Sequence, residues 1–257
     1  MKSSHYLFPA LIMFAASTPL AYANEGEFEP FFEAVIMGGI ASLHAGDSTI
    51  DMTASETDKL VQTNENDWNS WIGQLGLGYV FQLTDEWASG EVQWFPLITP
   101  QLNLYVLGNG EIKGDMYQYE SAALNNLDYT ADFNSTRVMF DLNVTLAAIE
   151  QFSVYALAGA GIAWNTIDFQ ATPNLNGLAC GANGFNIESA SSTSFAYEFG
   201  AGLTYAMADD IALSLEYLYT GLNDVGIGNE DDIGFDLQSA DFDMNTQAIL
   251  FGVRFAL

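Results

Sequence analysis

The feature that most constrains this chain is a repeated alternation of large apolar residues with polar or small ones. In residues 136–146, for example, Phe140, Leu142 and Val144 alternate with Asp141 and Asn143. A repeat of two over this length indicates a β-strand, because a helix repeats every 3.6 residues. No stretch after residue 23 approaches the roughly 18 consecutive apolar residues of a membrane helix. The chain is therefore predicted to be all-β.

Eight segments carry strand character. They are residues 32–45, 71–83, 87–107, 136–146, 152–165, 195–207, 211–220 and 249–257. The faces of the first and fifth segments are ambiguous, because both are apolar and rich in glycine. Pro96 and Pro100 interrupt the third segment, and proline removes ladder donors. We interpret it as one long strand with an irregular middle, which gives eight strands. If it is two strands, the total is ten.

The connections between these segments alternate in length. The short ones are 84–86, 150–151 and 208–210, and the long polar ones are approximately 46–68, 108–134, 166–193 and 223–245. This alternation is typical of a transmembrane antiparallel up-and-down β-barrel with short periplasmic turns and long extracellular loops. Closure of the barrel removes the strand edges that lipid does not tolerate.

A soluble lipocalin-like barrel also has eight alternating strands, but its apolar side faces inward. The two faces of the predicted strands distinguish these alternatives. The polar face is small, with residues such as Gly76, Gly200 and Gly252, which suits a narrow interior. The large face carries aromatic residues near the strand ends, such as Tyr79 and Tyr205, which suits the interfacial girdles of a membrane barrel.

The N-terminus has the pattern of a secretory signal peptide. Lys2 supplies a positive charge, residues 7–16 are apolar, and Ala21-Tyr22-Ala23 is a cleavage motif. We expect residues 1–23 to be a signal peptide and residues 24–257 to form the barrel domain. An even number of strands predicts a multi-pass protein of the outer membrane with both termini in the periplasm.

Several strands resemble those of the small outer-membrane β-barrel proteins of Gram-negative bacteria, which include opacity-type surface antigens and OmpA-like transmembrane domains. The resemblance rests on "WIGQLGLGYVFQL", "YALAGAGIAWN", "FAYEFGAGLTYAM" and the ending "AILFGVRFAL". It implies a barrel that contacts outer-membrane lipid and lipopolysaccharide and is inserted by the barrel assembly machinery. Members of this family usually end on an aromatic residue, whereas this chain ends on Leu257 with Phe255 two residues earlier.

Charged residues on the polar strand faces form the first candidate site. They are expected to line the lumen and to pair, because an unpaired buried charge costs several kcal/mol. The candidates are Arg137, Arg254, Glu91, Asp141, Glu198 and Glu216. They either form a structural plug or gate a narrow pore. We expect both arginines to contact Glu198, Glu216 or Asp141.

The acidic loops form the second candidate site. The formal net charge is −28, which argues against a nucleic-acid partner because phosphate binding needs clustered cations. The four long segments hold 20 acidic residues and two lysines. They form either a solvated surface or a low-affinity binding region for Ca²⁺ or Mg²⁺, centred on Glu230, Asp231 and Asp232. No calcium-loop motif is present.

Catalysis has little support in the sequence. His44 is the only histidine after the signal segment, and Cys180 is the only cysteine. We therefore predict a monomeric, non-enzymatic protein without a cofactor. Its predicted role is structural, adhesive or interactive, through the acidic loops. The alternatives are a small passive pore for ions or solutes and, more remotely, an outer-membrane enzyme.

Overall fold

The computed structural model describes residues 29–46, 48–53, 56–64, 67–83, 88–89, 92–180, 183–226 and 239–257. The predicted signal peptide, the short connection at 84–86 and most of segment 223–245 lie outside these residues. The strands are β1 (Phe31–Ala45), β2 (Ser48–Thr53), β3 (Glu56–Gln62), β4 (Ser70–Gln82), β5 (Ala88–Ser89), β6 (Val92–Trp94), β7 (Leu97–Tyr117), β8 (Asn125–Ile149), β9 (Phe152–Pro173), β10 (Phe185–Ala208), β11 (Ile211–Gly226) and β12 (Ser239–Ala256). The helices are α1 (Leu175–Cys180) and the 3-10 turns η1 (Gln118–Glu120) and η2 (Ala122–Leu124).

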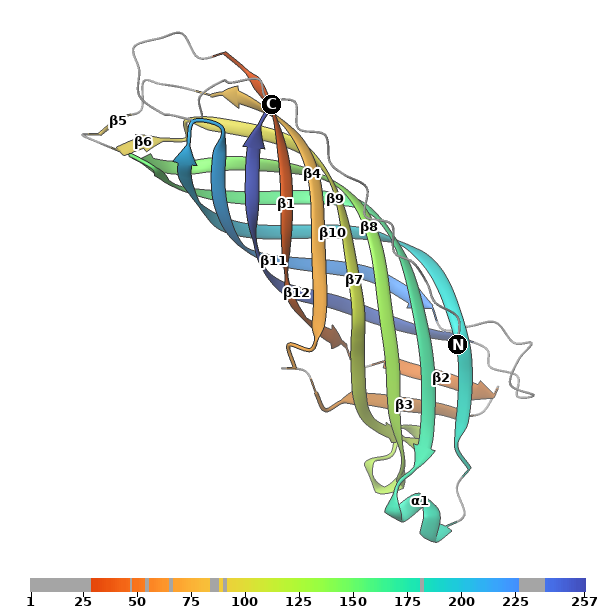
Figure 1. Cartoon of the computed structure of the whole chain (residues 1–257). Coiled ribbons are helices and arrows are strands. Elements are labelled where there is room, and N and C mark those ends of the chain that lie inside the picture. The colour runs from red at the N-terminus through yellow and green to blue at the C-terminus, as the bar shows by residue number, and fades with distance from the viewer. Residues whose placement is uncertain are drawn as a thin grey trace, which may run out of the picture.

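Eight long strands close into an antiparallel barrel (Figure 1). The ring runs β1–β4–β7–β8–β9–β10–β11–β12 and closes through thirteen residue pairs between β12 and β1. This confirms the all-β fold and the count of eight rather than ten. The first residue of β1, Phe31, and the last residue of β12, Ala256, lie at the same end of the barrel as the tight turns at residues 150–151 and 209–210. We call this end of the barrel the turn end. No helix within the described ranges is long and apolar enough to cross a membrane.

Near the turn end, the predicted single strand over 87–107 is wrong. The long strand begins only at Leu97, and the preceding residues form the short strands β5 and β6. Strand β6 pairs with the end of β8, for example Trp94 with Ala147. Phe95 has a positive φ of 50°, which breaks the strand before Pro96. The alternation of polar and apolar residues over 87–107 therefore continues across an interruption of the strand.

At the opposite end, the structure replaces three of the predicted loops by strands. Segments 108–134 and 166–193 are mostly continuations of β7, β8, β9 and β10, and segment 46–68 contains the hairpin β2–β3. The hairpin takes the place of β1 and β4 in the wall, because β2 pairs with β12 and β3 pairs with β7. We call this second, continuous stretch of barrel the extension. In Figure 1 it is the lower end, which also carries α1.

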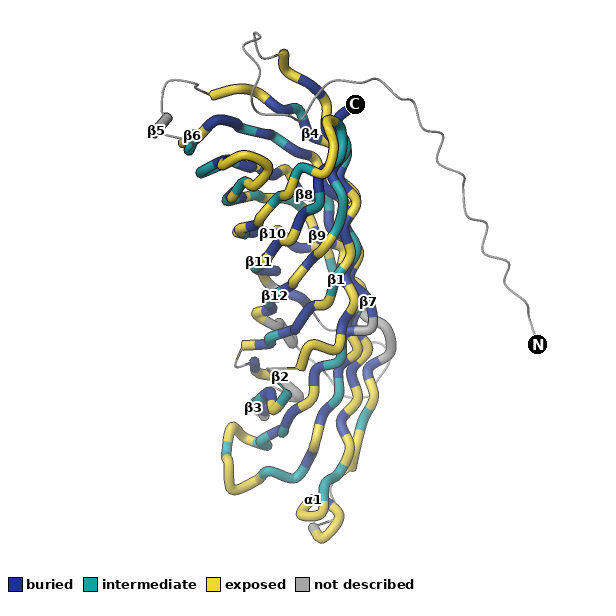
Figure 2. The backbone as a smooth tube through the Cα atoms, turned by 60° about the vertical axis from the view of Figure 1, so that its left-hand side comes forward, coloured by how far each residue is buried: buried dark blue, intermediate teal, exposed yellow. Residues whose placement is uncertain are grey.

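Strand β8 shows why the sequence of the extension looked like a loop. Its inward positions are buried from Leu127 to Asn143, and Figure 2 shows the alternation of buried and exposed positions along the tubes. In the extension the inward residues are apolar, including Tyr129 and Phe133, and the outward ones are polar, including Asp132. Beyond residue 136 the polarity reverses, so that Arg137 points inward and Phe140 is 61% exposed. The odd-numbered positions of β8 thus point inward along both parts of the barrel, but the polarity of the two faces is opposite in the two parts.

The interior of the barrel consequently has two parts. The extension encloses an apolar core, whose fully buried members include Ile50, Leu60, Ile112, Met116, Leu127, Phe133, Ile167, Phe169, Leu222 and Met244. The other part, which we call the lumen, is lined by buried amides, hydroxyls and charged groups. An eight-stranded barrel is about wide enough for side chains to fill. Both parts are filled in this way.

Two side-chain amides close the wall where the hairpin replaces β1 and β4. Oε1 of Gln62 accepts the backbone N–H of Ala45 (2.7 Å), and its Nε2 donates to the carbonyl of Leu43 (2.9 Å). Asn64 makes the same pair of bonds to the backbone of β7, both at 2.9 Å. Each amide therefore acts as a peptide group of a missing strand, which satisfies backbone groups that would otherwise be unpaired.

Candidate functional site

One candidate site is a cluster of Arg254, Glu33 and Glu216 in the lumen near the turn end, the Arg254 cluster. All three residues are at most 6% exposed. Nη1 of Arg254 lies 2.9 Å from Oε1 of Glu33, and its Nη2 lies 3.7 Å from Oε2 of Glu216. The guanidinium also lies 4.7 Å from the ring centroid of Tyr155, whose hydroxyl donates to Glu216 at 2.7 Å. The guanidinium is held between its two carboxylates.

A second cluster lies further toward the extension and contains Arg137, Asp141 and Glu198, the Arg137 cluster. All three residues are fully buried. Nη1 of Arg137 donates to the hydroxyl of Thr246 (3.2 Å), and the guanidinium lies 5.4 Å from the ring centroid of Tyr105. No hydrogen bond joins this guanidinium to a carboxylate among the described residues, so its surroundings differ from those of Arg254.

A chain of amides connects the two clusters. Asn103 donates to the carboxylate of Asp141 and, at 3.5 Å, to Oε1 of Gln101. Gln101 in turn donates to Glu33 (2.7 Å), and Asn143 donates to Oε1 of Gln101 (2.5 Å). The lumen therefore contains one continuous polar network rather than separate ion pairs.

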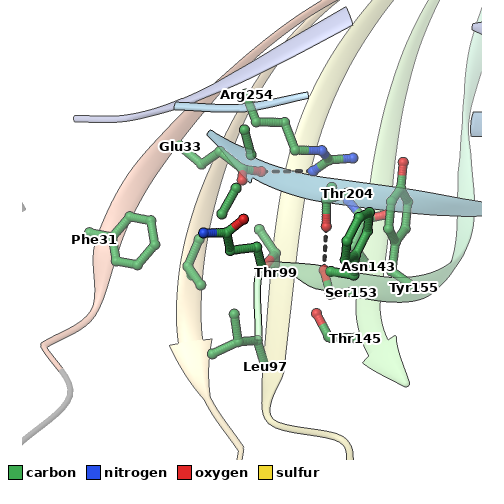
Figure 3. Close-up of a pocket in the computed structure, with 15 residues that line it drawn as sticks. Phe31, Glu33, Leu97, Thr99, Asn143, Thr145, Ser153, Tyr155, Thr204 and Arg254 are labelled. Atoms are coloured by element: carbon green, nitrogen blue, oxygen red, sulfur yellow. Dashed lines mark hydrogen bonds and ion pairs between the residues drawn. The ribbon is translucent and has the colours of Figure 1, made fainter. Parts of the chain in front are cut away.

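The lumen opens at the turn end into a cavity of about 60 Å³ (Figure 3). Arg254, Glu33 and Asn143 line its inner side, and Phe31 and Leu97 lie near its rim. Such a volume holds a few water molecules at most. The network is thus accessible to small molecules from the turn end, whereas the apolar core covers it on the side of the extension.

The outer wall of the extension is acidic. Glu111, Asp132 and Asp168 are directly paired positions on β7, β8 and β9, and Asp132 and Asp168 are exposed. Nζ of Lys113 lies 2.6 Å from Glu111, and this hydrogen bond with the nearby negative charges raises the pKa of Lys113. Like charges directly opposite on neighbouring strands oppose pairing, so this row does not serve the stability of the sheet.

The structure describes only some of the candidate residues from the sequence. Glu91, Glu230, Asp231 and Asp232 lie outside the described residues. Asp58, one of the 20 acidic residues of the long segments, is buried and accepts the backbone N–H of Tyr119 at 2.9 Å, so it is not part of a solvated surface. Among the described residues, no group of three acidic, histidine or cysteine residues could hold a metal ion.

Two further residues of interest are His44 and Cys180. His44 lies near the end of β1, and its Nδ1 has no hydrogen-bond partner among the described residues. No carboxylate within the described ranges, which leave out Asp47, therefore orients Nδ1 as a general base would require. Cys180 is the last residue of α1.

Sequence analysis missed Glu33, which hydrogen-bonds Nη1 of Arg254 in the Arg254 cluster. The inward residues beside it, Phe31, Val35 and Met37, are apolar, so β1 shows no contrast between its faces. The sequence did contain one signal, which is a single acidic residue in an otherwise apolar strand. Because a buried carboxylate needs a partner, such a residue indicates an interaction inside the barrel.

The chain is similar to known outer-membrane proteins. Its sequence matches the family profile described as "Outer membrane protein beta-barrel domain" over residues 8–255. No curated protein sequence matches it significantly.

Solved structures with some similarity include neisserial surface protein A (NspA), with 12% identity, coverage of 88% of this chain and 97% of that chain, and a TM-score of 0.40. OprG of Pseudomonas aeruginosa has 14% identity, coverage of 88% and 95%, and a TM-score of 0.39. Ail, the attachment invasion locus protein of Yersinia pestis, has 14% identity, coverage of 87% and 98%, and a TM-score of 0.33. Because the family profile spans nearly the whole sequence, this chain belongs to the outer membrane β-barrel family, the transmembrane barrels of Gram-negative bacteria.

Proposed function

We propose that this protein is a closed, non-catalytic surface protein of the outer membrane, whose extension interacts with molecules outside the cell. The observation that carries this proposal is the apolar core of the extension, which closes one end of a lumen filled by buried polar and charged side chains. A passive pore needs a continuous water-filled path, and large side chains such as Phe133 and Phe169 occupy the place of such a path. The structural or adhesive role is therefore favoured over the pore.

In this proposal the turn end and both termini face the periplasm, and the extension faces outward. The exposed outer wall of the extension is polar and acidic, so it belongs in water, whereas the outer wall around the lumen exposes Phe140, Leu102 and Phe251. Barrels of this kind place their short turns in the periplasm. The same arrangement leaves Phe255 and Leu257 at the periplasmic end, where we propose that the assembly machinery reads them.

Planar-bilayer conductance of the refolded chain tests whether the barrel is closed. We expect no unit steps, with insertion verified by protease protection of the lipid-embedded strands. Regular unit steps would favour the pore and remove this proposal.

Cysteine labelling of intact cells tests the orientation. In a Cys180→Ser background, Thr172→Cys places a thiol on the exposed wall of the extension, and Asp209→Cys is the matched position in a turn. A membrane-impermeant maleimide should label the first variant on intact cells and the second only after lysis. The opposite result would invert the topology.

The acidic face also supports a proposal about partners. Carboxylates beside the phosphates of lipopolysaccharide repel them over about 8 Å at physiological salt. We propose that Ca²⁺ or Mg²⁺ binds weakly across these groups, with Glu230, Asp231 and Asp232 at the centre, and relieves this repulsion. A chelator should then accelerate proteolysis within 223–245 in lipopolysaccharide bilayers, and equal cleavage rates would contradict the proposal.

A further inference from the structure

We propose that Asp141 and Glu198 share one proton inside the lumen, so that the Arg137 cluster carries no net charge. This inference concerns the interior of the barrel and does not depend on the proposed interaction role.

The strand register brings the two carboxyl groups together. Asp141 of β8 pairs with Gly159 of β9, and Gly159 pairs with Glu198 of β10. The three residues therefore form one row across three strands spaced about 4.8 Å apart. Gly159 has no side chain, and a methyl group there would overlap the carboxylate of Asp141. The carboxylate of Asp141 thus occupies the space over the glycine, between its own strand and the strand that carries Glu198.

The hydrogen bonds leave one oxygen of each carboxyl group for the other. Asn103 donates to Oδ2 of Asp141, and Thr220 donates to Oε2 of Glu198 at 3.5 Å. Oδ1 of Asp141 and Oε1 of Glu198 are buried and have no donor among the described residues. The strand register thus places two buried carboxyl groups, each with one oxygen that lacks a donor, in one row. Because a carboxylate carries no hydrogen, the two groups can hydrogen-bond to each other only if one of them is protonated.

The surrounding charges lead to the same result. The charged or titratable groups around the pair are Arg137 on β8, the phenol of Tyr105 on β7 and Glu216 on β11. No guanidinium nitrogen of Arg137 hydrogen-bonds either carboxyl group, so two ionised carboxylates would be buried here without the direct pairing that offsets their desolvation, at a cost of several kcal/mol. Two carboxylates in contact also cannot both ionise readily. One shared proton removes both costs.

The Arg254 cluster shows the arrangement that these residues do not adopt. There Nη1 of Arg254 donates to Glu33 at 2.9 Å, and Nη2 lies 3.7 Å from Glu216 without a hydrogen bond. In the Arg137 cluster no guanidinium nitrogen donates to a carboxyl group, and Nε and Nη2 have no hydrogen-bond partner among the described residues. One guanidinium and two carboxyl groups are thus held together by a guanidinium–carboxylate hydrogen bond in the first cluster and, in this proposal, by a shared proton in the second.

Infrared spectroscopy of the protein refolded in lipid vesicles at neutral pH tests the proposal. A protonated carboxyl group has a carbonyl stretch that a carboxylate lacks. We expect the wild-type protein to show this band and both Asp141→Asn and Glu198→Gln to lose intensity equivalent to one group per chain, because either amide leaves a single carboxylate to pair with Arg137. Asp168→Asn, on the exposed wall, is the matched control and should keep the band.

Two results would overturn the proposal: the absence of the band in the wild-type protein, or its full retention in either variant. If the variants do not fold, the wild-type protein is instead labelled with carbon-13 in the side-chain carboxyl groups of aspartate or of glutamate. The band should shift with at least one of these labels in the wild-type protein. A spectrum without a band that shifts with either label would contradict the shared proton.

Discussion

Replacement of Arg254 by methionine should destabilise the barrel strongly. The substitution keeps much of the side-chain volume but leaves Glu33 and Glu216 without their shared cation. At the observed distances of 2.9 and 3.7 Å, each attraction is on the order of 5 kcal/mol before desolvation is considered, for an effective dielectric constant of about 20. Removal of one partner from a buried ion pair typically costs about 3–5 kcal/mol. We expect a loss of that size in the free energy of unfolding.

The assay is equilibrium unfolding in urea of protein refolded into lipid vesicles, followed by tryptophan fluorescence. A triple variant, Arg254→Met with Glu33→Gln and Glu216→Gln, provides the control, because replacement of all charged partners is often nearly neutral. It should recover most of the lost stability. A loss below about 1 kcal/mol in the single variant, or no recovery in the triple variant, would refute the view that these charges act as one cluster.

Three further predictions concern other parts of the barrel. Phe133→Ala should increase hydrogen exchange in the extension by a factor that corresponds to about 3–5 kcal/mol, whereas Phe140→Ala on the outer face should leave it unchanged; equal effects would contradict the apolar core. Gly159→Ala should lower the free energy of unfolding by about 1–3 kcal/mol, because the added methyl group meets the Asp141 carboxylate. Gly73→Ala, whose methyl group meets nothing within 4 Å, should lower it less. The reverse order would count against the register. Asn64→Ala should speed proteolysis of the β2–β3 hairpin, since it removes two hydrogen bonds to the backbone of β7 and one from Gln62, each worth about 1 kcal/mol. An unchanged rate would show that the amide does not hold the wall.

The orientation of most strands could be predicted from the sequence because one face of each strand is apolar and the other is polar or small. Phe140 and Arg254 show this clearly, since one is on the apolar outer face and the other in the lumen. Strand β1 lacks that contrast, and Glu33 was missed for this reason. The partners of Arg137 could not be derived either, because neighbours around a closed barrel depend on strand register and shear.

The extension was misinterpreted for a different physical reason. Residues 125–134 alternate as regularly as those of any other strand, with Leu127, Tyr129 and Phe133 on one parity. Their high polarity nevertheless suggested a loop. In water a barrel turns its apolar face inward, whereas in lipid it turns that face outward. When the same alternate positions of a strand change from apolar to polar, the change therefore indicates a strand that leaves the membrane. That signal was present in the sequence.

Hydrogen exchange along β8 in lipid bilayers tests the central claim most directly. Strand β8 spans both parts of the barrel, from Asn125 in the extension to Ile149 at the turn end. If the extension is a packed barrel that closes the lumen, the amides of residues 127–133 should be protected to a degree comparable with those of residues 138–144. Exchange of residues 127–133 at the rate of an unstructured peptide would show that this region is a set of loops, and would contradict the closed barrel.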